Sequence, residues 1–408
     1  MHILLLHQAF AALGEPGGTR HHEMARYLTE GGHRVTVLAG GVRYLTGEAT
    51  QRSRWLDKDR DDRGVRIWRP YTYHGWHKSF VHRVFSFLSF MVSSFLAGLG
   101  VRGVDVVWGT SPPLFQAVSA WLLARLKGVP FVLEVRDLWP LFAIEVGVLR
   151  SDLLISLSRW LERFLYRRAD WIVVNSPGFI EHVSARGGER VELIPNGVDV
   201  SMFDPGSSGK AFRDEHDLDS AFVVLYAGAH GMSNDLGVVL EAASQVAAPE
   251  VLFVLLGAGK EKEYLQAESR RLGLTNLRFV DPVPKQRMPA ALAAADVCLA
   301  ILKPIDAYKT TYPNKVFDYM AAGRPVVLVI DGVIRQVVEE AGAGVFVPPG
   351  DPAALAAAVE QLRSQPDKAR EMGRRGRRYV AEHFDRNEWA QRLAVVFERV
   401  VAEEAAER

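Results

Sequence analysis

The segment "PNKVFDYMAAGRPVV", residues 313–327, has the pattern of a short helix that stops at a glycine and runs directly into a strand. The apolar residues before Gly323 lie on one helical face, and the run after it is rich in valine. Such a unit is typical of a parallel α/β domain. Asp318 interrupts the apolar face, and Lys315 lies at the helix start. The segment therefore predicts an α/β fold, and its two charges are candidates for a binding site.

Apolar, β-rich runs alternate with helical patterns on both sides of this segment. The runs lack an apolar–polar alternation, as expected for strands that helices cover on both faces. They predict doubly wound parallel sheets with right-handed crossovers. The first series of predicted strands is 2–6, 34–39, 65–68, 104–108, 130–135, 170–175 and 191–195. The second is 222–228, 250–257, 276–280, 296–302, 325–330 and 344–348.

The stretch "PNGVDVSMFDPGSSGKAF" at residues 195–212 lacks periodicity and reads as a linker between the two series. We therefore expect two Rossmann-like domains, an N-terminal one at 1–200 and a C-terminal one at 201–385, facing across a cleft. The apolar-striped helix at 386–408 either packs back on the first domain or completes the second. Ligands of such folds bind at the carboxyl ends of the strands, so the loops there should hold the chemistry.

The bulk composition excludes several classes of function. The chain has 408 residues and a net charge of +1, so no global field selects nucleic acid as a partner. Its one cysteine, Cys298, lies in the apolar run "DVCLAIL", which favours a buried thiol and a reducing, cytoplasmic location. The start "MHILLLHQ" lacks the basic region of a secretory signal. No Cys/His spacing typical of a metal site appears, and we expect no metal and no cofactor.

Several loops of the second series are suited to binding a nucleotide diphosphate. Glycines after strands let the backbone approach a ligand, and a helix N-terminus flanked by lysines favours an anion. Asp318 could accept hydrogen bonds from a ribose diol. The alternative is an Asn314 helix cap with a Lys315–Asp318 pair, and a solvated Lys260. The donor-binding candidates are Gly228, His230, Lys260, Pro284, Lys309, Asn314, Lys315 and Asp318.

Two loops of the first series could hold an acceptor or a phosphate. Gly17 and Gly18 precede a helix with Arg20 near its start, although their spacing is not the G-x-G-x-x-G dinucleotide fingerprint. A flexible connection capped by Thr19 and a solvated Arg20 are the alternatives. Glu134 lies inside a strand, and a buried carboxylate needs a partner, so we expect it to contact an arginine. The other candidates are Arg136 and Asp137, which follow the same strand and could also form a salt-bridged loop pair.

Three stretches resemble the family 4 glycosyltransferases of GT-B fold: "LIPNGVDVSMF", "HQAF…GGTRHHEMARYLTEGGHRVTVLAGG" and "NKVFDYMAAGRPVV". The stretch "SPPLF…PFVLEVRDLWP" is similar to a bacterial surface-polysaccharide branch that includes N-acetyl-fucosamine transferases. The resemblance implies a retaining, metal-independent transferase that uses a nucleotide-diphosphate sugar, with UDP preferred. It places Asp318 on the ribose, whereas Thr310 stands at the position of a first motif glutamate. The loop "GAHGMSND" lacks the family's arginine and lysine, so we predict that Lys309 and Lys315 hold the phosphates.

The resemblance further implies that an N-acetylated or deoxy hexose moves to a saccharide or a polyprenyl-diphosphate-linked acceptor. It makes Arg136 and Asp137 acceptor-side candidates without assigning a base. A GT-B-fold nucleotide-sugar epimerase and a non-catalytic nucleotide-sugar binding protein are the alternatives. The apolar run from Phe80, about twenty residues long, predicts a core helix or a helix lying in a membrane interface rather than a span. Its flanks (Arg66, Arg69, Trp76, His77, Lys78 and Arg83) and the basic run 158–171 suit the cytoplasmic leaflet.

Overall fold

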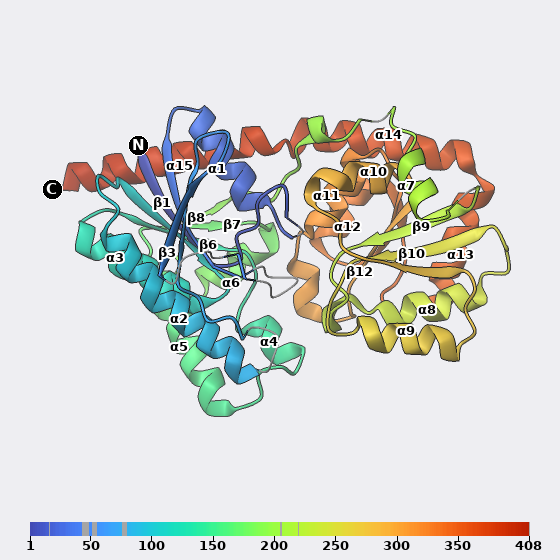
Figure 1. The fold of residues 1–408 in the computed structure, drawn as a ribbon, viewed down its shortest axis with the longest axis horizontal. Coiled ribbons are helices and arrows are strands. Elements are labelled where there is room, and N and C mark those ends of the chain that lie inside the picture. The colour runs from blue at the N-terminus through green and yellow to red at the C-terminus, as the bar shows by residue number, and fades with distance from the viewer. Residues whose placement is uncertain are drawn as a thin grey trace. The chain divides into compact units, whose positions relative to one another are not determined.

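A computed structural model describes residues 1–15, 17–42, 49–50, 55–75, 80–204, 206–218 and 220–407 (Figure 1). The chain divides into two compact units. The first comprises Met1–Leu13, Gly17–Pro195 and Arg386–Arg408, and the second comprises Gly14–Pro16 and Asn196–Asp385. The sequence analysis placed the division after residue 200, whereas it falls at the start of the predicted linker. The C-terminal helix belongs to the first unit.

The described part of the first unit contains an eight-stranded sheet of order β3-β4-β2-β1-β5-β6-β7-β8. All neighbouring strands are parallel except β3 and β4, which pair antiparallel at one edge. The strand order reverses between β1 and β5, so the loops after these strands flank the switch point. The strands are β1 (His2–His7), β2 (Arg34–Ala39), β3 (Leu56–Arg60), β4 (Arg66–Pro70), β5 (Val106–Ser111), β6 (Phe131–Val135), β7 (Trp171–Val174) and β8 (Val191–Leu193).

Helices cover both faces of this sheet because successive residues of each strand point to opposite sides. In β1, Ile3 and Leu5 pack in the cluster that includes Phe397 of the C-terminal helix, while Leu4 and Leu6 pack in the opposite cluster. The helices are α1 (Arg20–Glu30), α2 (Phe80–Leu99), α3 (Leu114–Lys127), α4 (Leu141–Glu145), α5 (Asp152–Arg168), α6 (Ile180–Ser184) and α15 (Arg386–Glu407), with a short 3-10 helix η1 (Pro177–Phe179).

The described part of the second unit contains a six-stranded parallel sheet of order β11-β10-β9-β12-β13-β14. Its order reverses between β9 and β12. The strands are β9 (Phe222–Ala227), β10 (Val251–Leu256), β11 (Leu277–Val280), β12 (Val297–Ile301), β13 (Val326–Val329) and β14 (Gly344–Phe346). The helices are α7 (Lys210–Glu215), α8 (Leu236–Gln245), α9 (Lys262–Arg271), α10 (Met288–Ala293), α11 (Asn314–Ala321), α12 (Val333–Glu340), α13 (Pro352–Ser364) and α14 (Pro366–His383). Short 3-10 helices are η2 (Val200–Met202), η3 (Met232–Asn234), η4 (Lys285–Arg287) and η5 (Asp306–Thr310).

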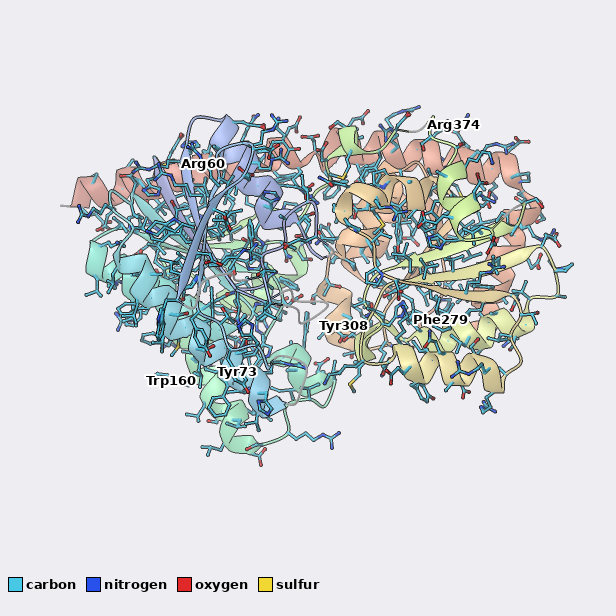
Figure 2. All side chains as sticks on the ribbon, viewed as in Figure 1. Arg60, Tyr73, Trp160, Phe279, Tyr308 and Arg374 are labelled. Carbon is cyan, nitrogen blue, oxygen red and sulfur yellow. The ribbon has the colours of Figure 1, made fainter. Side chains whose placement is uncertain are left out.

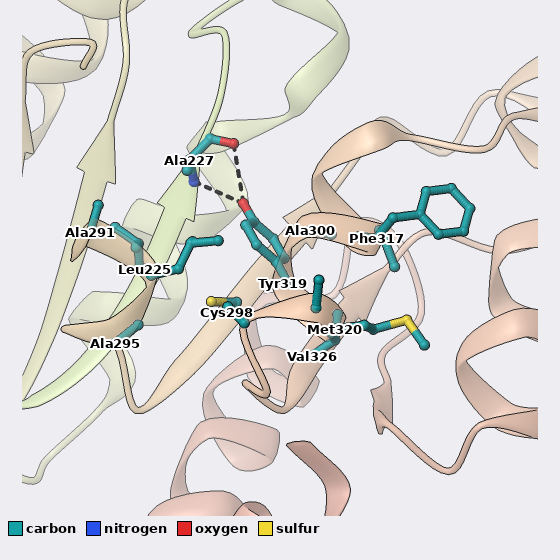
Figure 3. Packing of buried hydrophobic residues seen from close by; sticks show 14 of the residues in the cluster. Leu225, Ala227, Ala291, Ala295, Cys298, Ala300, Phe317, Tyr319, Met320 and Val326 are labelled. Carbon is teal, nitrogen blue, oxygen red and sulfur yellow. Dashed lines mark hydrogen bonds between the residues drawn. The ribbon is translucent and has the colours of Figure 1, made fainter. Parts of the chain in front are cut away.

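Each predicted strand overlaps an observed one, and the α/β prediction is confirmed. The prediction missed β3, "LDKDR", because its charged residues give no apolar run. An edge strand tolerates such charges because only one of its sides pairs with the sheet. Cys298 is buried in the core of the second unit, and burial raises the pKa of its thiol to about 12 (Figure 3). Its interpretation as a core thiol is therefore confirmed.

Candidate active site

The candidate donor site lies at the switch point of the second sheet. The loop after β9 and the segment after β12 meet there: the Tyr308 hydroxyl donates to Ser233 Oγ at 2.6 Å, and the Lys303 amide donates to the Ser233 carbonyl at 3.0 Å. Tyr308 is labelled in Figure 2. The segment after β12 leads through η5 into α11, so the N-terminus of α11 is held close to the end of β9.

Tyr319 fixes α11 on the sheet. Its hydroxyl accepts from the Ala227 amide at 2.9 Å and donates to the Ala227 carbonyl at 3.1 Å (Figure 3). Tyr319 is buried, and Phe317 and Met320 of the same helix pack in the same core. Because Ala227 is the last residue of β9, this double contact sets the position of the helix relative to the strand end. The sequence analysis missed this anchor.

Lys315 carries a partly buried positive charge at this place. Its Nζ donates to the Tyr226 hydroxyl at 2.9 Å and to Asn234 Oδ1 at 3.3 Å, and it lies 4.1 Å from the Tyr226 ring centroid. No carboxylate pairs with it in the described part of the chain. Burial lowers the pKa of Lys315 to about 7. The ammonium is therefore short of negative charge, which a diphosphate would supply.

Gly228 lies next to the Lys315 ammonium. A Cβ atom built on Gly228 would stand 2.8 Å from Lys315 Nζ, and one built on Gly257 would stand 1.8 Å from the Gly228 carbonyl oxygen. A side chain at Gly228 would collide with Lys315 and Tyr226, and one at Gly257 would collide with the loop after β9. Gly228 therefore makes room for the Lys315 ammonium, and Gly257 allows the loops after β9 and β10 to approach each other closely.

Asp318, one turn further along α11, makes an ion pair that the sequence analysis did not foresee. Lys285 Nζ lies 2.6 Å from Asp318 Oδ2, and both side chains are largely buried. The other carboxylate oxygen, Oδ1, is buried without a hydrogen-bond partner among the described residues. A buried acceptor without a partner is rare in proteins and points to a missing donor. The alternative of a Lys315–Asp318 pair is wrong, because the two side chains take different partners.

The remaining donor-side candidates are spread more widely. Asn314 is exposed and begins α11, and the capping position is Pro313, so the alternative of an Asn314 cap is wrong. Lys309 forms an exposed i,i+3 pair with Asp306 at 2.8 Å. Lys260 is exposed. Pro284 precedes η4 and thereby directs Lys285 inward.

His230 is buried in the loop after β9, and neither ring nitrogen has a hydrogen-bond partner among the described residues. Burial, together with the nearby charges of Lys262 and Lys315, lowers the pKa of His230 to about 4. His230 is therefore a neutral imidazole at neutral pH. Lys262, rather than Lys260, is the lysine at the start of α9 that contacts the loops around it. It donates to the Gly257 carbonyl at 3.0 Å and pairs with Asp281 at 2.6 Å.

In the first unit, the structure corrects the role expected for Arg20. Arg20 is buried; its Nε donates to Glu134 Oε1 at 2.9 Å, and its Nη atoms donate to the Ile194 and Pro195 carbonyls. It is neither solvated nor placed as a phosphate ligand. The expectation that Glu134 contacts an arginine is confirmed. The other Glu134 oxygen lies 2.9 Å from His21 Nε2.

Charge compensation explains how this cluster tolerates burial. Burial alone would raise the pKa of Glu134, but His21 and Arg20 hold it well below its usual range. Burial lowers the pKa of His21 to about 4 although Glu134 opposes this shift. The cluster joins α1, β6 and the segment that leaves β8, so it serves the architecture of the unit.

Arg136 and Asp137 follow β6, as predicted. Arg136 Nη2 donates to the Pro112 carbonyl at 2.9 Å, across to the loop after β5. Asp137 is solvent-exposed, and among the described residues no ion pair joins it to Arg136. Desolvation by the surrounding protein raises the pKa of Asp137 to about 6, although the positive charge of Arg136 opposes this shift. An acidic group with a raised pKa at a strand end is a candidate for proton transfer.

Gly17 and Gly18 precede α1, as predicted. A Cβ atom on Gly18 would meet no atom within 4 Å, so its backbone is open to a ligand. Thr19 occupies the capping position and donates through its hydroxyl to Glu23 at 2.9 Å. Within the described ranges, no group of three or more His, Cys, Asp or Glu side chains is arranged to hold a metal ion.

Comparison with known proteins places this geometry in a family. Residues 17–197 match the "Glycosyl transferase 4-like domain", and residues 221–365 match "Glycosyl transferases group 1". Together these matches span most of the chain, one in each unit. The chain is a glycosyltransferase of group 1 with a family 4-like N-terminal domain. It is thereby of GT-B type.

Relatives and solved structures agree with this assignment. The glycosyltransferase is 27% identical over 353 residues to the putative colanic acid biosynthesis glycosyl transferase WcaI of Escherichia coli, covering 83% of this chain and 86% of the relative. It has the fold of sucrose-phosphate synthase from Thermosynechococcus elongatus (TM-score 0.79, 18% identity, 98% and 99% covered). It also has the fold of Anabaena HepE in complex with UDP-glucose (TM-score 0.71, 16% identity, 98% and 100% covered).

Proposed function

We propose that this glycosyltransferase moves a sugar, with retention of configuration, from a UDP-sugar to a saccharide or polyprenyl-diphosphate-linked acceptor in surface-polysaccharide synthesis. The observation that carries the donor half is the unpaired Lys315 ammonium beside Gly228, one turn from a carboxylate with an unused oxygen. UDP is chosen because the fold neighbour HepE holds UDP-glucose. The surface-polysaccharide role is supported by the similarity to WcaI.

In the proposed reaction, the bond between the anomeric carbon and the β-phosphate oxygen breaks as an acceptor hydroxyl oxygen bonds to the same face of that carbon. The hydroxyl proton passes to the departing phosphate, and UDP leaves. Lys315 and the N-terminus of α11 stabilise the charge that develops on the phosphate. Asp318 holds a ribose hydroxyl. These phosphate donors are cationic or amide groups, which supports a metal-independent reaction; unchanged turnover in EDTA tests that part.

The acceptor half of the proposal uses the loops of the first unit. Gly18 leaves room for a ligand beside the backbone, and Asp137 supplies an exposed carboxyl with a raised pKa. Arg136, tied to the Pro112 carbonyl, is a charge that could face an acceptor phosphate. The sugar is proposed to be an N-acetylated or deoxy hexose, on the resemblance to the N-acetyl-fucosamine transferase branch.

The deciding experiment measures UDP release from a panel of UDP-sugars, with and without a polyprenyl-diphosphate-linked sugar. A transferase releases UDP and extends the acceptor only when both substrates are present. A nucleotide-sugar epimerase converts the donor without acceptor, and a binding protein retains UDP-sugar without releasing UDP. Asp318→Ala serves as the negative control, because it removes the proposed ribose contact with the UDP-sugar and should lower turnover of either enzyme.

We further propose that the first unit docks on the cytoplasmic leaflet of a membrane. Among the described residues, Val81–Leu99 of α2 is long and apolar enough to cross a membrane by length and composition alone, a test that core helices also pass. One stripe of α2 with Ser86, Phe90 and Ser94 is buried, whereas Phe85 is exposed. This half-buried pattern favours an interfacial helix over the core or spanning alternatives.

Helix α5 extends the same side, because α2 and α5 both pack against α3. Its exposed residues include Leu157 and Trp160 (Figure 2). A surface hollow of about 830 Å³ beside Trp160 is lined by Arg159, Arg163, Arg167 and Arg168. Apolar side chains beside arginines suit an anionic headgroup layer. Of the flanking residues, Arg69 is buried and donates to the Gly40 carbonyl, so it does not belong to the proposed surface. The flanking residues 76–78 lie outside the described ranges.

Sedimentation with vesicles tests this docking. Vesicles that contain anionic phospholipid should retain the protein better than zwitterionic ones, and Trp160→Glu should weaken the retention severalfold. Val395→Glu is the matched control, because Val395 is equally an exposed apolar residue but lies on α15. Equal retention of the two variants would contradict the proposed surface.

A further inference from the structure

The Lys285–Asp318 ion pair is the feature of the second unit that the proposed function does not yet use. Lys285 lies in η4 after β11, and Asp318 lies on α11, so the pair joins two segments that are distant in sequence. Nζ and Oδ2 are 2.6 Å apart, and the side chains are 9% and 15% exposed. The ammonium also lies 5.5 Å from the centroid of the Phe203 ring, which limits its access to water.

The pair leaves Asp318 half satisfied. Oδ2 accepts from Lys285, whereas Oδ1 is buried and has no partner among the described residues. An ionised carboxylate accepts hydrogen bonds at both oxygens, so Oδ1 is ready for a donor that the protein itself does not supply. The orientation of that oxygen is set from outside the helix by Lys285, because a carboxylate held at one oxygen cannot turn freely.

We propose that Lys285 is a positioning residue for the nucleotide-sugar donor: it holds the Asp318 carboxylate so that Oδ1 alone accepts from a single ribose hydroxyl. This inference rests on the proposed function, because the ligand is the ribose of the UDP-sugar. The inference adds Lys285 to the donor site as a residue that acts through Asp318. It also limits Asp318 to one oxygen that accepts from the ribose. A carboxylate free at both oxygens would instead be able to accept from both hydroxyls of the diol.

The backbone around η4 explains why the Lys285 side chain points inward to Asp318. Pro284 precedes η4 with φ −56° and ψ 152°, an extended conformation from which the chain turns into the 3-10 helix. Lys285 is consequently buried, while Arg287 of the same turn points outward and pairs with Glu215. The turn thus separates one inward cation from one outward cation. Only the inward one reaches α11.

The test compares the binding of UDP, 2′-deoxy-UDP and 3′-deoxy-UDP by titration calorimetry. In the natural protein, removal of the contacted hydroxyl should weaken binding by about tenfold or more, since a hydrogen bond to a charged group is lost, and removal of the other should have a much smaller effect. In Lys285→Met, UDP should bind about tenfold more weakly and the discrimination against the deoxy analogue should fall to about threefold or less. Lys285→Arg should restore part of it.

A double variant separates positioning from a general structural role. If Lys285 acts through Asp318, Lys285→Met should change UDP affinity by no more than about twofold in an Asp318→Asn background. Lys210→Met is the matched control, because Lys210 forms an exposed i,i+4 pair with Asp214 on α7. It should leave both affinity and discrimination unchanged. Lys285→Gln carries the same comparison should the methionine variant fail to fold.

The outcomes distinguish the inference from the proposed function. A wild-type ratio of UDP to deoxy-UDP affinity that persists in Lys285→Met overturns the positioning role. Binding of UDP and of both deoxy analogues with equal affinity overturns the ribose contact and leaves nucleotide binding standing. Equal losses for both deoxy analogues in the natural protein overturn the single-acceptor geometry. Failure of the natural protein to bind UDP overturns this inference together with the choice of UDP as the donor nucleotide.

Discussion

Replacement of Lys315 by methionine tests the proposed donor site most directly, because the Lys315 ammonium has no carboxylate partner among the described residues of the free protein. Burial lowers the pKa of its ammonium to about 7. A bound diphosphate would restore the opposite charge and raise that pKa. The complex then holds a proton that much of the free protein has lost. UDP binding should therefore take up a proton above pH 7, and its affinity should fall as pH rises.

The magnitude follows from the free-state pKa. At pH 8 about one tenth of the free Lys315 is protonated, so binding should take up about 0.9 proton, whereas at pH 6 it should take up about 0.1. Between pH 7 and 9 the affinity should fall by about fiftyfold in all, and the slope approaches tenfold per pH unit above pH 8. Below pH 7 this dependence levels off, and the terminal phosphate of UDP, with a pKa of about 6, begins to titrate. Measurements near pH 8 therefore isolate the lysine.

Calorimetry in two buffers of different ionisation enthalpy measures the proton uptake. His230 does not contribute near pH 8, because its pKa is lowered to about 4. In Lys315→Met the uptake should drop to near zero, and UDP should bind about 10- to 100-fold more weakly, as expected for the loss of a charged hydrogen bond. Lys210→Met should keep the full uptake. Proton uptake of the same size in Lys315→Met and in the natural protein would refute the assignment.

Three further predictions follow from the described contacts. Tyr319→Phe should lower the unfolding free energy by about 1–3 kcal/mol, measured by denaturant titration, because both polar groups of Ala227 lose their side-chain partner. Glu134→Gln should cost about 3–5 kcal/mol in the same assay, because it leaves the buried Arg20 without its counter-charge. Lys309→Met should change turnover by no more than about twofold, since its pair with Asp306 is exposed; a tenfold loss would return Lys309 to the phosphate site.

The sequence predicts the fold well because the signal is local. Strands buried on both faces leave continuous apolar runs, and β2 was predicted at its observed bounds, residues 34–39. The same logic anticipated that Glu134 needs an arginine, but it could not say which one. Arg20 was available in the sequence as a helix-start residue, and only the three-dimensional pairing of α1 with β6 shows that it is buried rather than free.

Only part of the candidate site could be predicted from the sequence. The rest could not, because the type of a residue does not determine its environment. Lys309 and Lys315 lie six residues apart and looked equivalent, yet η5 turns Lys309 toward solvent while α11 carries Lys315 inward. Lys285 and Tyr319 were missed because their partners are side-chain or backbone atoms distant along the chain. A lysine within "VPKQRMP" carries no periodic signal that would reveal a carboxylate on α11.

Charge compensation, rather than position, distinguishes the lysine that we propose binds the phosphate. Lys262, Lys285 and Lys309 all lie near strand ends of the second unit, and each is paired with a carboxylate. Lys315 is partly buried and, unlike these three, has no carboxylate partner among the described residues. Burial of an unpaired charge is unfavourable, and a fold retains it where a ligand of opposite charge completes the site. The paired lysines can accept a phosphate only by giving up a partner, whereas Lys315 gains one, so the diphosphate should be drawn to Lys315 first.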